Sequence, residues 1–246
     1  MLPRFHAPDL DPDRSETALP ADEAHHLTRV LRLGVGDEIA VFDGRGREYR
    51  ARVTLAAKDA ARVVLVEPVV PAPESSVRLT IVQAVLKGEA MDEVVRDATM
   101  MGVGAIVPLL SAHVAVRAQS LERSGAVARW RRIALASAKQ CRRATLPHVS
   151  EPARLADWIA GGDEALRLLF VEPSAACRPV PLRAWLERPA PPSAAVMVGP
   201  EGGWAPGEIE QAVACGCIPV TLGGLTLRAD AVPVAALALC RFVFGE

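Results

Sequence analysis

The sequence predicts an α/β protein in which a mostly parallel sheet follows a smaller β-rich segment. From residue 78 onward, apolar runs of strand length alternate with longer helical patterns, which is typical of such a sheet. Residues 1 to about 70 instead contain strands with one buried face, where apolar and polar side chains alternate. A proline-rich stretch at residues 68–76 is typical of a stiff linker. We therefore expect two domains, at residues 1–70 and 71–246.

In the first segment we expect one helix followed by short strands. The helix begins after Pro20, has acidic residues in its first turn, and ends at Gly34. Ala24, Leu27 and Leu31 recur at helical spacing and form its apolar face. Strands are predicted at residues 38–42, 49–55 and 62–67, with a hairpin turn at residues 43–46.

In the second segment, strands and helices alternate. Strands are predicted at residues 78–85, 105–110, 166–171, 196–198 and 217–222. Helices are predicted at residues 90–101, 121–141, 180–187, 205–210 and 231–244. Asp230 stands where it would cap the last of these helices.

Two glycine loops follow the last two predicted strands. Gly199-Pro200-Glu201-Gly202-Gly203 comes directly after the apolar run that ends at Val198, and Gly223-Gly224 follows residues 217–222. Loops at the carboxyl ends of neighbouring strands are where an open α/β sheet binds its ligand. Judged on glycine content alone, a pair of ordinary strand–helix turns explains them equally well.

Composition limits the class of protein further. The chain has 246 residues, of which 50% are hydrophobic, so it can bury a substantial core. No apolar run reaches the length of a membrane span, and the N-terminus lacks the apolar core of a signal peptide, so we expect a cytoplasmic protein. The five cysteines form no zinc-binding pattern and no disulfide framework. We interpret them as small buried apolar side chains and expect no metal.

The charge is small overall but uneven. The formal net charge of the chain is −1. The segment between His113 and Arg143 contains eight basic residues and one acid, so its own net charge is eight minus one, or about +7. Such a segment favours phosphate binding, although a solvated helix face is an alternative. The basic residues are Arg117, Arg123, Arg129, Arg131, Arg132, Lys139, Arg142 and Arg143.

The exact residues of the two glycine loops resemble those of a known family. Gly199-Pro200-Glu201-Gly202-Gly203, followed by Leu222-Gly223-x-x-x-Leu227-Arg228, resembles the SPOUT RNA methyltransferases. The likeness is greatest to the RsmE family, which methylates N3 of a uridine in 16S ribosomal RNA of the small subunit. The pieces Arg4-Phe5, His25-His26-Leu27 and Val30-Leu31-Arg32 resemble the PUA-like RNA-binding domain of that family, so the likeness covers nearly the whole chain.

The resemblance implies a fold, a cofactor and partners. The fold would be a SPOUT-type parallel sheet with a C-terminal deep trefoil knot, preceded by a small PUA-like β-barrel. The knot would hold S-adenosylmethionine, and the protein would be a homodimer that acts on the small ribosomal subunit. A knot is a rare exception to unthreaded topology, and the local pattern contains no sign of it.

The resemblance also implies site residues. Gly199, Gly202 and Gly223 would allow close approach to the cofactor, and Leu222, Leu225 and Leu227 would form apolar walls. The full predicted cofactor set is Val171, Glu172, Met197, Gly199, Pro200, Glu201, Gly202, Leu222, Gly223, Leu225 and Leu227. The predicted RNA contacts are Arg4, His26, Arg29, Arg32, Lys87, Gln140, Arg142 and Arg143.

Three charged residues have two possible roles each. Arg228 could stabilise negative charge on the uracil or form an ion pair that holds its loop. Asp230 could be a general base or a helix cap, and Glu201 could orient the cofactor or cap the following helix. We interpret Arg228 and Asp230 as the catalytic pair.

The chain departs from the family pattern at four places. It has Met100-Met101, His113, Arg142 and Asp230-Ala231 where the family usually has Glu-Leu, arginine, glycine and Glu-Thr. A non-catalytic RNA-binding assembly factor is an alternative that the Asp230-Ala231 departure supports. A SPOUT enzyme with another target, such as a ribose 2′-hydroxyl of transfer RNA, also stays open. No loop has the Gly-Lys-Ser/Thr ending of a nucleotide hydrolase.

Overall fold

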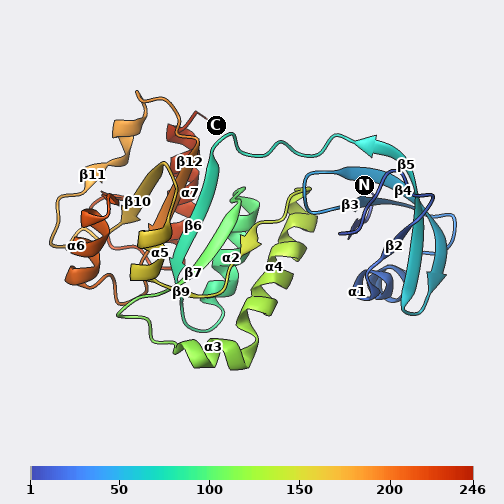
Figure 1. The fold of residues 1–246 in the computed structure, drawn as a ribbon, viewed down its shortest axis with the longest axis horizontal. Helices are drawn as coiled ribbons and strands as arrows, with labels where there is room; N and C mark the ends of the chain where they lie inside the picture. Colours follow the sequence, from blue (N-terminus) through green and yellow to red (C-terminus); the bar gives the residue numbers. More distant parts are fainter. Residues whose placement is uncertain (1, 246) are drawn as a thin grey trace. The chain divides into compact units, whose positions relative to one another are not determined.

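The structure is a computed structural model that describes residues 2–245 (Figure 1). These residues form two compact units. The first unit comprises the chain up to Glu74 together with Leu135–Leu146, and the second comprises Ser75–Ala134 together with the chain from Pro147 onward. The inclusion of Leu135–Leu146 in the first unit is not visible in the sequence pattern. Residues 1–70 and 71–246 remain our proposal for the independently folding domains.

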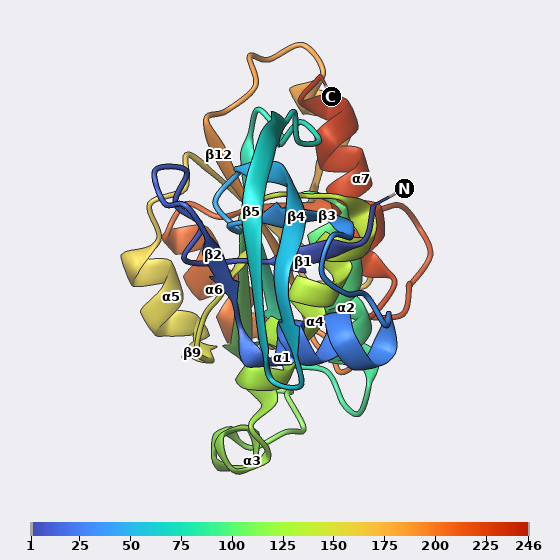
Figure 2. The ribbon, with the colours of Figure 1, turned by 90° about the vertical axis from the view of Figure 1, so that its right-hand side faces the viewer.

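The first unit is built on a curled five-stranded sheet (Figure 2). Its spatial order is β1-β3-β4-β5-β2, and every pair is antiparallel except β1 with β3. The expected alternation is present in β4, because Ala51 and Val53 are buried whereas Arg52 between them is exposed. The strands are β1 (Arg4–His6), β2 (Thr17–Leu19), β3 (Glu38–Phe42), β4 (Glu48–Ala57) and β5 (Ala60–Val69).

The helix of the first unit differs from its prediction. A short α1 (Ala21–His25) continues as a turn of π-helix, η1 (His26–Val30). The wider π turn carries Leu31 away from the core, and this side chain is 40% exposed although we expected it on the buried face. The chain reverses at Arg32, which has a φ of 56°, and not at Gly34.

The second unit is a parallel eight-stranded sheet between helices. Its order is β11-β13-β10-β12-β6-β7-β8, and β9 also pairs with β7. The predicted α/β class with a mostly parallel sheet is therefore confirmed. The strands are β6 (Arg78–Ala84), β7 (Ala105–Leu110), β8 (His148–Val149), β9 (Ala153–Arg154), β10 (Leu166–Phe170), β11 (Val180–Pro181), β12 (Ser193–Val198) and β13 (Ile218–Thr221).

Two apolar cores cover the two faces of this sheet. On one face, α2, α4 and α7 pack on side chains such as Ile81 and Val196, which alternate along the strands with those of the other face. On the opposite face, α5 and α6 pack on Val82 and Met197. The helices are α2 (Ala90–Met100), α3 (Ala118–Ser124), α4 (Ala126–Cys141), α5 (Leu155–Gly161), α6 (Pro206–Ala214) and α7 (Val232–Val243).

The order of the strands differs from their order in the chain. Strand β12 lies between β10 and β6, and the chain then passes through α6 to β13 on the far side of β10. The carboxyl ends of β12, β10 and β13 are therefore neighbours, although residues from three separate stretches form them. The trefoil knot remains a prediction.

Two predicted helices have a different form. The helix expected at residues 121–141 is two helices, because Gly125 adopts a φ of 63° and ends α3. The helix expected at residues 180–187 is β11 followed by a 3-10 turn at Leu182–Trp185. The short elements β1, β2, β8, β9 and α5 were not predicted.

The cysteines fit their interpretation only in part. Cys217 and Cys240 are buried, and burial raises the pKa of the Cys240 thiol to about 12, so it stays a neutral apolar group. Cys215 is exposed, which contradicts the interpretation for that residue. Within residues 2–245, no three His, Cys, Asp or Glu side chains gather as a metal site. No helix in the same range is long and apolar enough to cross a membrane.

Candidate functional site

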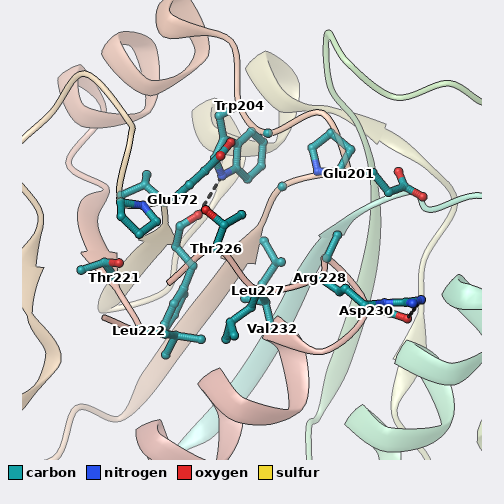
Figure 3. A pocket seen from close by; sticks show the side chains of 18 of the residues that line it. Glu172, Glu201, Trp204, Thr221, Leu222, Thr226, Leu227, Arg228, Asp230 and Val232 are labelled. Atoms are coloured by element: carbon teal, nitrogen blue, oxygen red, sulfur yellow. Dashed lines mark hydrogen bonds and ion pairs between the residues drawn. The ribbon is translucent and has the colours of Figure 1, made fainter. Parts of the chain in front are cut away.

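A pocket of about 410 Å³ opens where β10, β12 and β13 end (Figure 3). Its volume lies within the range of small-molecule sites, about 300–1,000 Å³. The lining combines apolar side chains, two glycines and several charged groups. It consists of Leu86, Ala90, Phe170, Val171, Glu172, Pro173, Val198, Gly199, Pro200, Glu201, Gly203, Trp204, Thr221, Leu222, Leu225, Thr226, Leu227, Arg228, Ala229, Asp230 and Val232.

The turn after β12 requires glycine at two positions. Gly203 donates its backbone N–H to the Pro200 carbonyl at 3.0 Å and has a φ of 67°. A Cβ atom on Gly203 would overlap the Glu172 carboxylate. A Cβ atom on Gly199 would lie 3.1 Å from the Trp204 indole, which is buried. The glycines thus let Glu172 and Trp204 pack directly against the turn.

Trp204 joins this turn to the neighbouring strand. Its indole is 8% exposed, and Nε1–H donates to the Phe170 carbonyl at the end of β10 over 3.0 Å. Figure 3 shows Trp204 beside Glu172 at one side of the pocket. The sequence reasoning did not include Trp204 in the site. Its position directly after Gly203 could have indicated this role, because a large side chain that follows a tight glycine turn packs against that turn.

Trp204→Phe tests this connection. The variant keeps an aromatic ring but leaves the buried Phe170 carbonyl without its donor, so we expect the free energy of unfolding to fall by about 1–3 kcal/mol. Urea denaturation, monitored by circular dichroism, measures this change. Trp158→Phe is the control, because Trp158 packs in the same core and makes no indole hydrogen bond that the structure shows. Equal losses in both variants would show that ring volume, and not the hydrogen bond, is responsible.

Glu208 caps the helix that follows the turn. Its Oε2 accepts the Ala205 N–H at 3.0 Å, and its Oε1 accepts the Ala112 N–H at 2.8 Å. The expected capping role of Glu201 is therefore wrong. Glu201 instead accepts the Lys87 N–H at 3.0 Å and holds the loop after β6 beside the pocket.

The loop after β13 forms the apolar wall. Thr221 Oγ1 lies 3.1 Å from the Gly223 carbonyl, to which it donates, and Gly223 has a φ of 127°. Leu222, Leu225 and Leu227 then line the pocket. Leu222 packs partly against the core, whereas Leu225 is 81% exposed, so the described chain leaves most of the Leu225 side chain uncovered.

Arg228 and Asp230 form a bidentate ion pair at the edge of the pocket (Figure 3). The Arg228 Nε and Nη2 atoms donate to the two Asp230 oxygens at 3.0 and 2.8 Å. The hydrogen bonds from Arg228 lower the pKa of Asp230, and the pair raises the pKa of Arg228. Asp230 is not the cap of α7, because the N-cap residue is Ala231.

Most of the predicted cofactor residues lie together in the pocket. Eight of the eleven line it, while Met197 is fully buried behind it, and Gly202 and Gly223 lie outside its lining. Their contacts with a cofactor remain predictions. Sequence reasoning missed Leu86 and Ala90, which reach the pocket from a part of the chain far from the glycine loops and show no local signal.

Two of the predicted RNA contacts are buried. Arg4 is 9% exposed and donates to the Glu48 carboxylate at 3.0 and 2.9 Å and to three backbone carbonyls. Arg143 is 5% exposed and donates to the Glu74 carboxylate at 2.6 Å. Their donors are already engaged within the first unit, which favours structural roles for both. The RNA contacts that the resemblance implies for them stay predictions.

The other predicted RNA contacts reach the surface. Arg29, Arg32, Gln140 and Arg142 are exposed in the first unit, His26 is half-buried against Phe5, and Lys87 is exposed in the second unit. Acids neutralise half of the basic segment between residues 113 and 143. The pairs are Arg129 with Asp92, Arg131 with Glu151, Lys139 with Glu23, and Arg143 with Glu74.

The pocket suits a ligand that is part apolar and part charged, as the expected cofactor S-adenosylmethionine is. Leu222, Leu225 and Leu227 offer apolar contact, and the Glu172 carboxylate offers negative charge to a cationic centre. These residues therefore fit the cofactor that the resemblance implies.

Family profiles match both parts of the chain. The RNA methyltransferase domain matches residues 73–241, and the RNA methyltransferase PUA domain matches residues 19–66. Ribosomal RNA small subunit methyltransferase E of Synechocystis sp. is 35% identical over 223 residues, which cover 89% of this chain and 71% of the relative. The protein of the same name from Mycobacterium tuberculosis is 30% identical over 238 residues, with 93% and 87% covered.

Solved structures match over the whole chain. Ribosomal RNA small subunit methyltransferase E of Neisseria gonorrhoeae, bound to S-adenosylmethionine, aligns with a TM-score of 0.86 and 30% identity and covers 99% of this chain and 98% of that one. A methyltransferase structure from Legionella pneumophila with bound S-adenosylmethionine aligns with a TM-score of 0.89 and 25% identity, with 98% of both chains covered.

Proposed function

Because this chain belongs to the family of ribosomal RNA small subunit methyltransferase E, we propose that it transfers a methyl group from S-adenosylmethionine to N3 of a uridine in 16S ribosomal RNA. The observation that carries the proposal is the pocket at the ends of β10, β12 and β13, where the two family-like glycine loops meet. The alternatives are another RNA target and a non-catalytic assembly factor. A ribosomal RNA enzyme would work in the cytoplasm, which we propose as its location.

The pocket would orient the two reactants. S-adenosylmethionine supplies an electrophilic methyl group on a sulfonium, and N3 of the uracil is the nucleophile. Holding reactants in line is worth up to about 7–11 kcal/mol of barrier. The turn Pro200–Gly203, braced by Trp204, and the leucine wall at residues 222–227 are the parts of this chain that would do so.

We propose that Arg228 stabilises the negative charge that develops on the uracil. The uracil gains negative charge as N3 loses its proton, and a positioned cation lowers the energy of that anion. Asp230 is a weak base in this structure, because the Arg228 hydrogen bonds lower its pKa. We therefore assign Asp230 to holding Arg228 in place, and the proton acceptor to another group.

We also propose that the RNA contacts the exposed polar residues of the first unit. Arg29, Arg32 and Arg142 would pair with phosphates, because exposed arginines bind planar anionic groups through several donors. The match of residues 19–66 to a PUA domain supports this assignment. His26 and Gln140 complete the proposed set in the first unit, and Lys87 is a separate proposed contact in the second unit.

A homodimer is the second partner that we propose. One face of α7 leaves three large apolar side chains exposed: Val234 at 36%, Leu239 at 42% and Phe242 at 65%. The opposite face, with Leu237 and Cys240, is buried in the core. A second copy of the chain would cover the exposed face, since monomeric proteins seldom leave such a patch open.

Phe242→Asp tests the homodimer. A charge at this position would be buried without a partner in the interface, so we expect the dimer dissociation constant to rise by at least about tenfold. Light scattering after size-exclusion chromatography over a dilution series measures it. The control is Val213→Asp, a change at a side chain that is 45% exposed on α6. A wild-type protein that is monomeric at all concentrations would contradict the proposal.

The proposed substrate class is tested by methyl transfer. Pure protein is incubated with labelled S-adenosylmethionine and either small ribosomal subunits that lack the N3-methyluridine mark or total transfer RNA. We expect label in the subunits alone. Label in transfer RNA would support the altered-target alternative, and cofactor binding without label in either RNA would support the non-catalytic one.

A further inference from the structure

The loop that follows β7 contacts the turn after β12 through His113. The His113 Nδ1 atom lies 3.0 Å from the Gly202 carbonyl oxygen and 3.1 Å from the Gly203 carbonyl oxygen. Both partners are acceptors only, so Nδ1 must carry the hydrogen and donate to them. His113 therefore makes a bifurcated hydrogen bond to two consecutive residues of the turn.

A second bond from the neighbouring residue reinforces this contact. The Ala112 N–H donates to Glu208 Oε1 at 2.8 Å, and the other Glu208 oxygen caps α6 at Ala205. The segment from Gly202 to Glu208 is thus attached to the β7 loop at both of its ends. Because Gly203 and Trp204 of this segment line the pocket, the attachment bears directly on the shape of the pocket.

The turn is held tightly between two side chains. A Cβ atom on Gly202 would lie 3.0 Å from His113 Cβ, and a Cβ atom on Gly203 would overlap Glu172 on the pocket side. His113 itself is exposed and is not in the pocket lining. Any effect of His113 on the pocket must therefore pass through the turn.

We propose that His113 is a positioning residue, whose Nδ1–H ties the Gly202-Gly203 turn to the β7 loop and keeps the pocket in the form that binds S-adenosylmethionine. This inference rests on the proposed function, because it takes S-adenosylmethionine as the ligand. If the turn occupies the binding-competent form for a smaller fraction of the time, the apparent affinity for S-adenosylmethionine falls in proportion to that fraction. The affinity for RNA stays unchanged, because His113 acts only on the cofactor side.

Asparagine and glutamine at position 113 provide a matched pair of variants. Asparagine places its amide N–H near the position of Nδ1, whereas glutamine places it near that of Nε2. We expect His113→Ala and His113→Gln to raise the dissociation constant for S-adenosylmethionine about tenfold, and His113→Asn to stay within about threefold of wild type, since one lost hydrogen bond is worth about one decade. Isothermal titration calorimetry measures these constants.

Two further measurements separate positioning from other roles. Amide hydrogen exchange of the peptide that covers residues 200–204, measured without ligand, should be faster in His113→Ala and His113→Gln than in wild type and His113→Asn. The Michaelis constant for RNA and the pH profile of transfer should be the same in wild type and His113→Asn. A pH profile changed in His113→Asn would instead indicate proton transfer by His113 and overturn the inference.

The failures can be told apart. If wild type binds S-adenosylmethionine and His113→Ala binds it equally well, the positioning role is wrong while the proposed function stands. If His113→Asn is as weak as His113→Ala, the Nδ1 hydrogen bond is not the cause, and the inference is also overturned. If wild type itself does not bind S-adenosylmethionine, the proposed function fails first and the inference fails with it.

Discussion

Replacing Gly203 with alanine is expected to weaken S-adenosylmethionine binding about 100-fold and to lower the free energy of unfolding by about 2 kcal/mol. An L-residue at a φ of 67° costs roughly 1–2 kcal/mol. The new methyl group would also occupy the position of the Glu172 carboxylate, which must move within the pocket that it lines. Calorimetric titration with S-adenosylmethionine and urea denaturation measure the two effects.

A double-mutant cycle separates the two causes. In a Glu172→Ala background the overlap disappears, so Gly203→Ala should cost only the backbone strain, about 1–2 kcal/mol. Gly207→Ala is the control, because Gly207 lies in α6 and a Cβ there meets nothing within 4 Å. Equal costs of Gly203→Ala in the two backgrounds would show that the contact with Glu172 contributes nothing.

Arg228→Ala is expected to reduce the turnover number for methyl transfer by about 10²–10³, the usual effect of removing one group that stabilises a developing anion. The dissociation constant for S-adenosylmethionine and the free energy of unfolding should change little. The Arg228 side chain is 84% exposed, and among residues 2–245 its hydrogen-bond partner is Asp230 alone. Single-turnover transfer to small ribosomal subunits measures the chemical step. Arg96→Ala is a matched control, since Arg96 is also exposed and paired with a neighbouring aspartate at 3.0 Å.

Asp230→Asn distinguishes the two roles of the aspartate. If Asp230 only holds Arg228, the asparagine can still accept a hydrogen bond from it, and the turnover number should fall less than about tenfold. Loss of a general base would cost about 10²–10⁴ and would make the rate depend on the ionisation of Asp230. Unchanged transfer in Arg228→Ala would contradict the assignment of Arg228.

The local sequence pattern predicted the parts of the site that lie within one stretch of chain. The glycine loops at residues 199–203 and 223–224 follow strands β12 and β13 as expected, because apolar runs and turn residues are local signals. Leu222, Leu225 and Leu227 line the pocket, and their contact with the cofactor stays a prediction.

The features that local pattern did not predict depend on distant contacts. Arg4 is buried because Glu48 and the carbonyls of residues 138, 139 and 143 surround it, and these partners lie 44 to 139 residues away. The resemblance implied an RNA contact for Arg4, and the local pattern shows none of these distant partners. The charge count of the segment between His113 and Arg143 likewise left out its acidic partners. The π turn at His26–Val30 shows no signal in the local pattern. The break at Gly125 has a local signal, the glycine itself, which was overlooked within an otherwise helical stretch.

We expect this pocket to direct a methyl group to N3 of one uridine. The most direct test is to react wild-type protein with small ribosomal subunits that lack the mark, digest the RNA with nucleases, and identify the methylated nucleoside by mass spectrometry. We expect 3-methyluridine at a single position, at close to one per subunit, and almost none with Gly203→Ala at limiting S-adenosylmethionine. A methyl group on a ribose, on another base or at scattered positions would contradict it.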